Sequence, residues 1–410
     1  MASDAEIDPS LREDLLAFLQ RDSTTARAGD LLRKFLRYSP RRQDESLAMP
    51  LQEMEERVAL IDKILPRFRR FLKEPNHQLT AIELSTLLII PLDRLRRLEA
   101  DAPAATIARC LNGAEVFIRL ALTGKPPPGI MARSKLATNE VQKVSEALQN
   151  LDISTRLDDS PGSSTTRTKS FRSAAEKNKA YERDNHACIV TGIIQAEVCH
   201  ILPFALNSTQ KNLEVTRHAS GFLTALFGTS YEDDAGTLLY DSIGCSDRAW
   251  NMLCLNRQLH WWWSKAFFAF KCLGITPKDE SNSCIDIQFH WIRMRGTAPK
   301  AKVDVTVDSI QNLLRDSPTS ECSFWATHVD SGRAVDSGEI FEIVLEHKKA
   351  TKMKIMIDIQ WAITRLAAMS GGADAPELLD DPDDPESTYQ AYLQQDLTLQ
   401  QMVRELWGEQ

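Results

Sequence analysis

The sequence lacks the paired cysteines that mark small zinc-binding folds. Its eight cysteines include no Cys-x-x-Cys pair, so neither a treble-clef nor a zinc-ribbon site is indicated. The chain opens with MASDAEIDPS, which has neither the basic nor the apolar segment of a secretory signal. We therefore expect an intracellular protein, in the cytoplasm or the nucleus, whose cysteines are reduced thiols.

Long hydrophobic runs and an overall positive charge are also missing. The apolar stretch at residues 84–92 is about half of the roughly 18 residues that a membrane span needs, so we expect no transmembrane segment. The net charge of -8 excludes a protein that is basic throughout, and much of it comes from the acidic block at residues 377–386. A local basic face is nevertheless enough for nucleic-acid binding.

Composition divides the chain into five regions. Residues 1–150 carry apolar side chains at helical spacing and predict a helical N-terminal region, whose helices are a candidate surface for a protein partner. Residues 151–173 form a basic linker rich in Ser and Thr, which is suited to touching phosphates or to being a solvated spacer. Residues 174–275 form a central domain, and residues 276–370 add strands and a helix that pack on it. Residues 371–410 form an acidic tail with a terminal helix.

Residue patterns also predict the individual elements. A short helix is expected at residues 174–184, followed by a strand at residues 187–192 that ends in a turn glycine. Gly371 and Gly372 are expected to end a helix. The other predicted strands are 285–295, 303–307 and 338–345, and the other predicted helices are 54–72 with an interruption at Pro66, 84–98, 107–122, 353–368 and 389–407.

Two separated segments carry a family resemblance. The first is RDNHACIVTGIIQAEVCHILP, with a His-Ile-x-Pro motif at His200, and the second is NMLCLNRQLHWWWSKAFFAF, with Asn251 nine residues before His260. Together they resemble the two halves of the ββα-metal finger of HNH endonucleases, and most closely the divergent branch of fungal-type proteins. The resemblance implies an α+β fold with a ββα-metal core and a long insertion, preceded by the helical region and followed by strands and C-terminal helices.

The resemblance also implies roles for these residues. His200 takes the position of the general base, because a histidine near neutral pKa can accept a proton from the attacking water. Asn251 takes the position of the residue that fixes the loop and orients the base. His260 takes the position of a ligand to a divalent metal ion, which stabilises charge on the phosphate. The expected substrate is a nucleic acid, DNA or RNA.

Two metal-ligand positions depart from the family pattern. Cys199 stands immediately before the base and Ser264 stands one turn after His260, where many HNH enzymes have His, Asp or Asn. Mg²⁺ prefers carboxylates and water, whereas Cys199 with His260 suits the softer Zn²⁺. The metal is therefore expected to be of the Mg or Zn type, on His260, Cys199 and Ser264. Glu197, on the same side of a strand as Cys199, is a further candidate ligand.

Other residues near the motif allow two interpretations each. Arg257, in the turn before His260, is a candidate phosphate contact. The three tryptophans at residues 261–263 point about 100° apart on a helix, so they cannot all face one core. One of them is expected to be exposed and to stack on a base, or all three pack between the central domain and the strands that follow. Residues 212–227 predict an inserted helix that forms a lid or packs in the core. His290 is expected to be structural.

Three functions remain open from the sequence. The first is an HNH-type endonuclease, a hydrolase of phosphodiester bonds. The second is an inactive HNH-fold module that binds nucleic acid or protein, which Cys199 and Ser264 favour. The third is a scaffold whose function lies in the N-terminal helices. The first requires His200 and His260 to face a common cleft, whereas burial of His260 by the tryptophans would exclude it.

Overall fold

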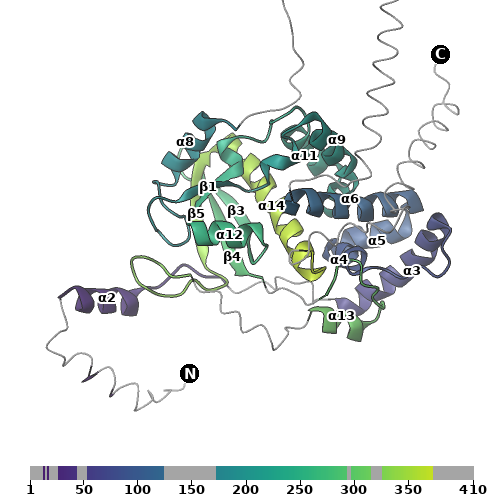
Figure 1. The fold of residues 1–410 in the computed structure, drawn as a ribbon, viewed down its shortest axis with the longest axis horizontal. Coiled ribbons are helices and arrows are strands. Elements are labelled where there is room, and N and C mark those ends of the chain that lie inside the picture. The colour runs from purple at the N-terminus through teal and green to yellow at the C-terminus, as the bar shows by residue number, and fades with distance from the viewer. Residues whose placement is uncertain are drawn as a thin grey trace, which may run out of the picture.

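The computed structural model describes residues 13, 16–17, 26–43, 53–123, 172–292, 297–314 and 326–372. Most of the predicted linker, the acidic tail and the terminal helix at residues 389–407 lie outside these ranges. The described part mixes helices with antiparallel strands, in agreement with the predicted class (Figure 1). None of its helices combines the length and the apolar character needed to cross a membrane.

The N-terminal region is helical, as the apolar spacing predicts. Its side chains meet those of α14 (His347–Met369) in one hydrophobic core. Pro66 lies inside α3 and does not interrupt it, because Ile61, Ile64 and Phe68 bury the helix face on both sides of the proline. The helices are α2 (Ala26–Arg37), α3 (Met54–Leu72), α4 (Ala81–Ile89), α5 (Leu92–Ala100) and α6 (Ala104–Thr123).

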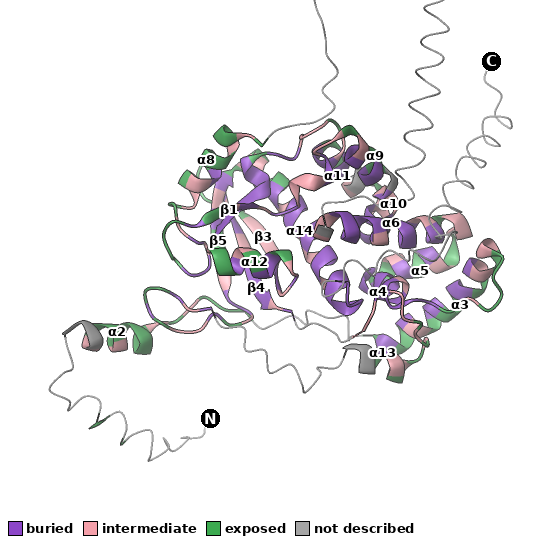
Figure 2. Cartoon of the chain, viewed as in Figure 1, coloured by how far each residue is buried: buried purple, intermediate pink, exposed green. Residues whose placement is uncertain are grey.

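The strands form two antiparallel sheets. β1 (Glu197–His200) pairs with β2 (Met252–Leu255), and β3 (Phe268–Pro277), β4 (Asn282–Trp291) and β5 (Ile340–Glu346) form the second sheet in that order. β4, β5 and α14 confirm three predicted elements within a few residues. α14 packs against β3 on one side and α4 on the other, and Figure 2 shows it buried along most of its length.

Two predicted strands are wrong. Residues 187–192 form a tight turn, in which Gly192 N–H donates to the Cys188 carbonyl at 2.9 Å and Gly192 has a φ of 75°. Residues 303–307 are not a strand either. An isolated bridge pairs the preceding residue, Lys302, with Thr80, and the chain then enters α13 (Val307–Leu314). Ala187 bridges to Ile194, the Ile189 N–H donates to the Cys254 carbonyl, and the Val303 N–H donates to the Leu79 carbonyl. Each segment thus makes isolated backbone bonds instead of a paired strand.

The insertion between the two motif halves is helical but is not one helix. It contains α9 (Gln210–His218), α10 (Ser220–Phe227) and α11 (Thr229–Leu239). Phe222 and Leu223 of α10 are fully buried, and the Phe222 ring lies 6.3 Å from that of Phe117 in α6. A Cβ on Gly113 of α6 would stand 2.9 Å from the Ala219 carbonyl oxygen, so the helices approach closely. The insertion therefore packs in the core.

The central domain also contains two short helices and two 3₁₀ turns. The helices are α8 (Ala174–Arg183), before β1, and α12 (Arg257–Ser264), after β2, and the turns are η1 (Phe204–Leu206) and η2 (Ala249–Asn251). α2 stands away from this body in Figure 1 and leaves Leu31, Phe35 and Leu36 exposed.

Core packing of the insertion is tested by a matched pair of leucine substitutions. Leu223→Ala is expected to lower the free energy of unfolding by about 2–5 kcal/mol, because it leaves a cavity between α10 and α6. Leu36→Ala, at a side chain that is 65% exposed, should change it by less than about 0.5 kcal/mol. Urea unfolding followed by circular dichroism measures both, and equal small losses would contradict the packing of α10.

Candidate active site

The short sheet and the helix after it hold the residues singled out by the motif. The antiparallel register places His200 opposite Met252. α12 follows β2 directly because Asn256 caps it, with its side-chain Oδ1 accepting the Leu259 N–H at 2.8 Å. The chain therefore turns after β2, and α12, which carries His260, packs against β1.

The end of α8 fixes the start of β2. Arg183 donates to the carbonyl oxygens of Ala249 at 2.8 Å and Met252 at 2.7 Å. Asp184 accepts the Cys254 N–H at 2.9 Å and pairs with Arg183 at 2.6 Å. The Arg-Asp helix end of the motif is thus structural, since it anchors the strand that follows Asn251.

Asn251 is completely buried and ties three segments together. Its Oδ1 accepts the Leu202 N–H at 2.9 Å, and its Nδ2 donates to the carbonyl oxygens of Leu202 at 3.0 Å and Ser246 at 3.1 Å. The Ile201 N–H donates to the Asn251 carbonyl at 2.8 Å. These bonds join the chain just after His200 to the loop before β2, which fits the loop-fixing role expected of Asn251.

His200 is paired with a carboxylate that the motif did not indicate. Its Nε2 lies 2.8 Å from Oδ1 of Asp247, and only 11% of the His200 side chain is exposed. Asp247 also accepts the Ser173 N–H. Burial would raise the pKa of Asp247, but the hydrogen bonds from His200 and Ser173 lower it below its ordinary value. The two residues are 47 positions apart, so only folding reveals the pair.

His260 is paired with Glu197. Its Nδ1 lies 2.7 Å from Oε2 of Glu197, and the side chains are 39% and 45% exposed. The tryptophans therefore do not bury His260. Trp262 and Trp263 pack inward, against Trp291 and Phe268, whereas Trp261 remains 56% exposed.

Cys199 and Ser264 lie in different surroundings. Cys199 is buried, and its thiol donates to the Leu253 carbonyl at 3.2 Å. Burial raises the pKa of this thiol well above its ordinary value, so binding a metal as a thiolate would require the loss of a proton and of the bond to Leu253. Ser264 is exposed, and its hydroxyl donates to the Trp261 carbonyl at 2.7 Å.

One cavity of about 360 Å³ collects most of these residues. The lining includes His200, Cys199, His260 and Ser264, and also Arg172, the last basic residue of the linker before α8. The Arg172 guanidinium stands over the Phe204 ring at 5.9 Å. Arg257 is exposed in the first turn of α12 and does not line this cavity. Of the three signature side chains, His200 and His260 line one cavity, whereas Asn251 is fully buried and does not line it.

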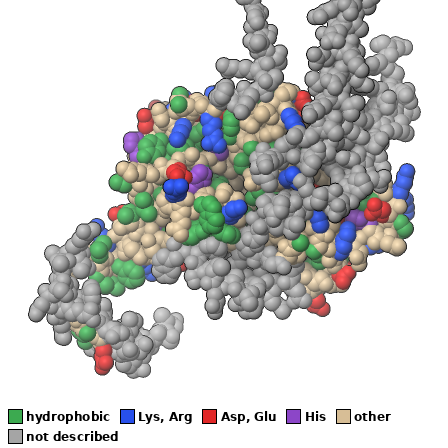
Figure 3. All heavy atoms as spheres, viewed as in Figure 1, with side chains coloured by type: hydrophobic (Ala, Val, Ile, Leu, Met, Phe, Trp, Pro, Cys, Tyr) green, Lys and Arg blue, Asp and Glu red, His purple; other side chains and the backbone are tan. Residues whose placement is uncertain are grey.

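A second hollow of about 560 Å³ meets the first at His260. Lys177, Glu197 and Val198 line it together with His260. Figure 3 shows acidic, basic and histidine side chains clustered where β1 and α12 face the viewer, with hydrophobic side chains beside them. Arg172 lines the first hollow and Lys177 the second, so each hollow contains one cation, and the carboxylate of Glu197 also lines the second.

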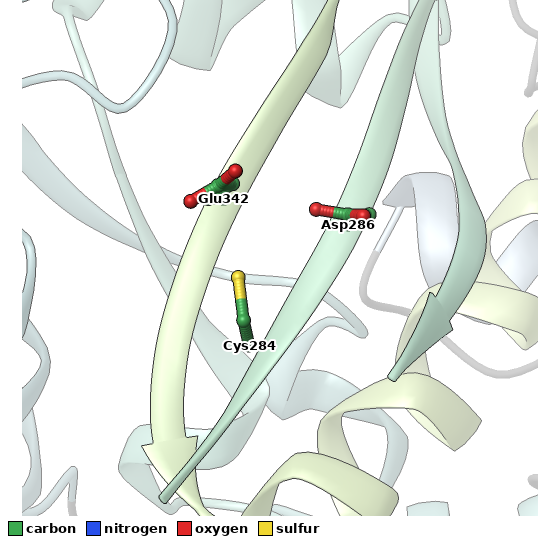
Figure 4. A group of neighbouring side chains, drawn as sticks. All are labelled: Cys284, Asp286 and Glu342. Atoms are coloured by element: carbon green, nitrogen blue, oxygen red, sulfur yellow. The ribbon is translucent and has the colours of Figure 1, made fainter. Parts of the chain in front are cut away.

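A group with three metal-ligating side chains occurs elsewhere in the described residues. Cys284 and Asp286 of β4 and Glu342 of β5 bring ligand atoms within 4.8 Å of one another, as Figure 4 shows on adjacent strands. Arg41 already pairs with both carboxylates, and its Nη2 lies 2.6 Å from Oδ2 of Asp286. This group lies outside the cavity lining of His200 and His260, and Arg41 offsets one of its two carboxylate charges.

The lowered pKa of Asp247 predicts a pH effect on stability. Its ionised form is favoured by folding, so the stabilisation is present above the ordinary value of 3.8 and is lost as the pH falls through the lower folded value. Below about pH 4 the free energy of unfolding should therefore fall more steeply in the wild type than in Asp247→Asn. Asp241→Asn, at an exposed position of the same loop, should keep the wild-type slope. Equal slopes for wild type and Asp247→Asn in urea titrations would contradict the pairing.

Comparison with known protein families finds a match for one part of the chain. A family model described as HNH endonuclease matches residues 188–271, which include β1, β2, α12 and the inserted helices. No curated protein and no solved structure matches the chain. An HNH domain indicates nuclease activity on a nucleic-acid substrate and the general use of a divalent metal. The chain therefore carries an HNH endonuclease domain at residues 188–271.

Proposed function

We propose that the chain is a metal-dependent endonuclease of the fungal-type HNH branch, in which β1, β2 and α12 form the ββα-metal core. The observation that carries this proposal is that His200 and His260 line the same cavity, each hydrogen-bonded to its own carboxylate. Such pairs fix the orientation of an imidazole and determine which of its nitrogens is available.

His200 acts as the general base. Its Nε2–H donates to Asp247, so Nδ1 is the nitrogen that takes the proton from water. The ionised Asp247 stabilises the imidazolium that this transfer creates, as a buried carboxylate does beside a catalytic histidine. The resulting hydroxide attacks phosphorus, the P–O bond to the leaving oxygen breaks, and solvent protonates that oxygen.

His260 would hold the divalent metal through Nε2. Glu197 accepts the Nδ1–H of His260 on the other side of the ring, so it would orient the imidazole, as a carboxylate commonly does for a metal-binding histidine. A single imidazole leaves the other coordination positions to waters and substrate phosphate oxygens, which a Mg²⁺-type ion uses. When bound, the metal would supply positive charge to the phosphate. Ser264 lines the same cavity as His260.

The flanking cations would bind the nucleic-acid backbone. Arg172 and Lys177 stand in the two hollows that meet at His260, so a strand crossing the imidazole passes both. Arg257 lies beyond this path and would contact a more distant phosphate.

An inactive HNH-fold module that binds nucleic acid is the second candidate. It is favoured by the weak ligand at Ser264 and by the burial of the Cys199 thiol against the Leu253 carbonyl. In the described residues, His260 and Glu197 belong to no group of three ligand atoms. This module would bind nucleic acid and leave it intact.

The catalytic role of His200 is tested by plasmid nicking with Mg²⁺, Mn²⁺, Zn²⁺ or Ni²⁺. His200→Ala should lower the rate by about 10²–10⁴-fold, because the proton acceptor is removed. His186→Asn, at an exposed histidine outside the cavity lining, should keep the wild-type rate. Equal residual nicking by wild type and His200→Ala would indicate a contaminant and would support the inactive module.

The ligand set is tested by titrating the protein with Mn²⁺ in a calorimeter. His260→Ala should abolish specific binding, and Glu197→Gln should weaken it about 10–100-fold through loss of the supporting carboxylate. Cys199→Ala should bind as the wild type does, because the thiol is buried and donates to the Leu253 carbonyl. Loss of binding in Cys199→Ala with retention in Glu197→Gln would restore the ligand set expected from the sequence.

A further inference from the structure

The helix that carries His260 has a buried face and an outer face. Leu259, Trp262 and Trp263 of α12 are buried in the core. The outer face joins His260 with three exposed residues, and all four follow the helical spacing i, i+3, i+4 and i+7: Arg257, His260, Trp261 and Ser264. The histidine proposed to bind the metal therefore shares the surface of one short helix with a cation and an indole ring.

Trp261 differs from the two tryptophans that follow it. Its exposed fraction is 56%, whereas Trp262 and Trp263 are 7% and 9% exposed. The exposed ring is nevertheless held by a neighbour, because the Phe267 ring lies 6.0 Å away, centroid to centroid, at an interplanar angle of 70°. An aromatic ring that is both exposed and supported offers a flat contact surface to a partner with little loss of conformational entropy.

The neighbours of Trp261 are those expected on a nucleic-acid surface. His260, the residue before it, lines the cavity together with His200. Arg257 is exposed one helical turn earlier, and a helical side chain leans toward that turn, so positions 257 and 261 are neighbours on the outer face. Proteins hold single strands with this combination, in which an aromatic ring stacks on a base and a cation pairs with the backbone.

We propose that Trp261 stacks on an unpaired base of the substrate, next to the phosphate at His260, while Arg257 pairs with an adjoining phosphate. The proposal rests on the endonuclease function. In a perfect duplex both faces of each internal base are already stacked, so the indole has no free base to contact. The substrate class is therefore a single strand, or a strand with locally unpaired bases. DNA and RNA share this chemistry, and the tests use both.

Stacking is tested by binding in EDTA, which removes the metal and prevents cleavage. Fluorescence anisotropy compares a labelled pyrimidine oligonucleotide with an abasic one of equal length, each made as DNA and as RNA. The wild type should bind the first about tenfold more tightly, because an aromatic side chain stacked on a base contributes at least that much. Trp261→Ala should lose this preference, whereas Trp261→Phe, which retains an aromatic ring, should keep most of it.

A second exposed aromatic residue supplies the matched control. Phe35→Ala removes a ring that is 44% exposed on α2, outside the nuclease domain, and should bind both oligonucleotides as the wild type does. Equal binding of the two oligonucleotides by the wild type would overturn the stacking proposal, and so would a preference that survives unchanged in Trp261→Ala.

The substrate class is tested by cleavage with Mn²⁺ of one sequence as a single strand and as a perfect duplex. The wild type should cut the single strand about tenfold faster or more, and Trp261→Ala should lose most of this difference. Equal rates on both forms would contradict the stacking role and leave the endonuclease intact. A binding preference that depends on Trp261, with no cleavage of either form, would support the stacking role and contradict the endonuclease.

Discussion

The amide of Asn251 holds together the three segments on which the site depends. It bonds both backbone groups of Leu202, just after His200, and the carbonyl of Ser246, just before Asp247. Without it, three buried backbone groups would lose their partners, at a cost of about 1–3 kcal/mol each. The 2.8 Å contact between His200 and Asp247 therefore rests on a side chain that itself lies behind the cavity wall.

The two histidines are held in opposite ways, and this difference separates their proposed roles. His200 is held through Nε2 by a buried carboxylate and is largely shielded, which suits a base that must keep one orientation. His260 is held through Nδ1 by an exposed carboxylate and stays open to solvent and substrate, which suits a metal ligand. α14 connects the core with the cavity beside both histidines. Its buried residues pack in the core against the second sheet, and some of them line the cavity.

The sequence predicted those parts of the site that depend on local spacing. The positions of His200, Asn251 and His260 follow from a motif whose strands and helix form locally, and the alternation at residues 285–295 and 338–345 correctly predicted β4 and β5. Asp247 could not be predicted, because its contact joins residues 47 positions apart through a loop. Alternation along a strand assigned Glu197 to the side of Cys199, but its long side chain at the strand end reaches α12.

The central claim is that His200 and His260 form one site for a metal and a phosphodiester. Anomalous scattering from a crystal of the wild-type protein with Mn²⁺ and a single-stranded oligonucleotide tests it most directly. We expect a manganese peak at His260, with a backbone phosphate between it and His200. A peak only at Cys284, Asp286 and Glu342, with no phosphate at the cavity opening, would contradict it.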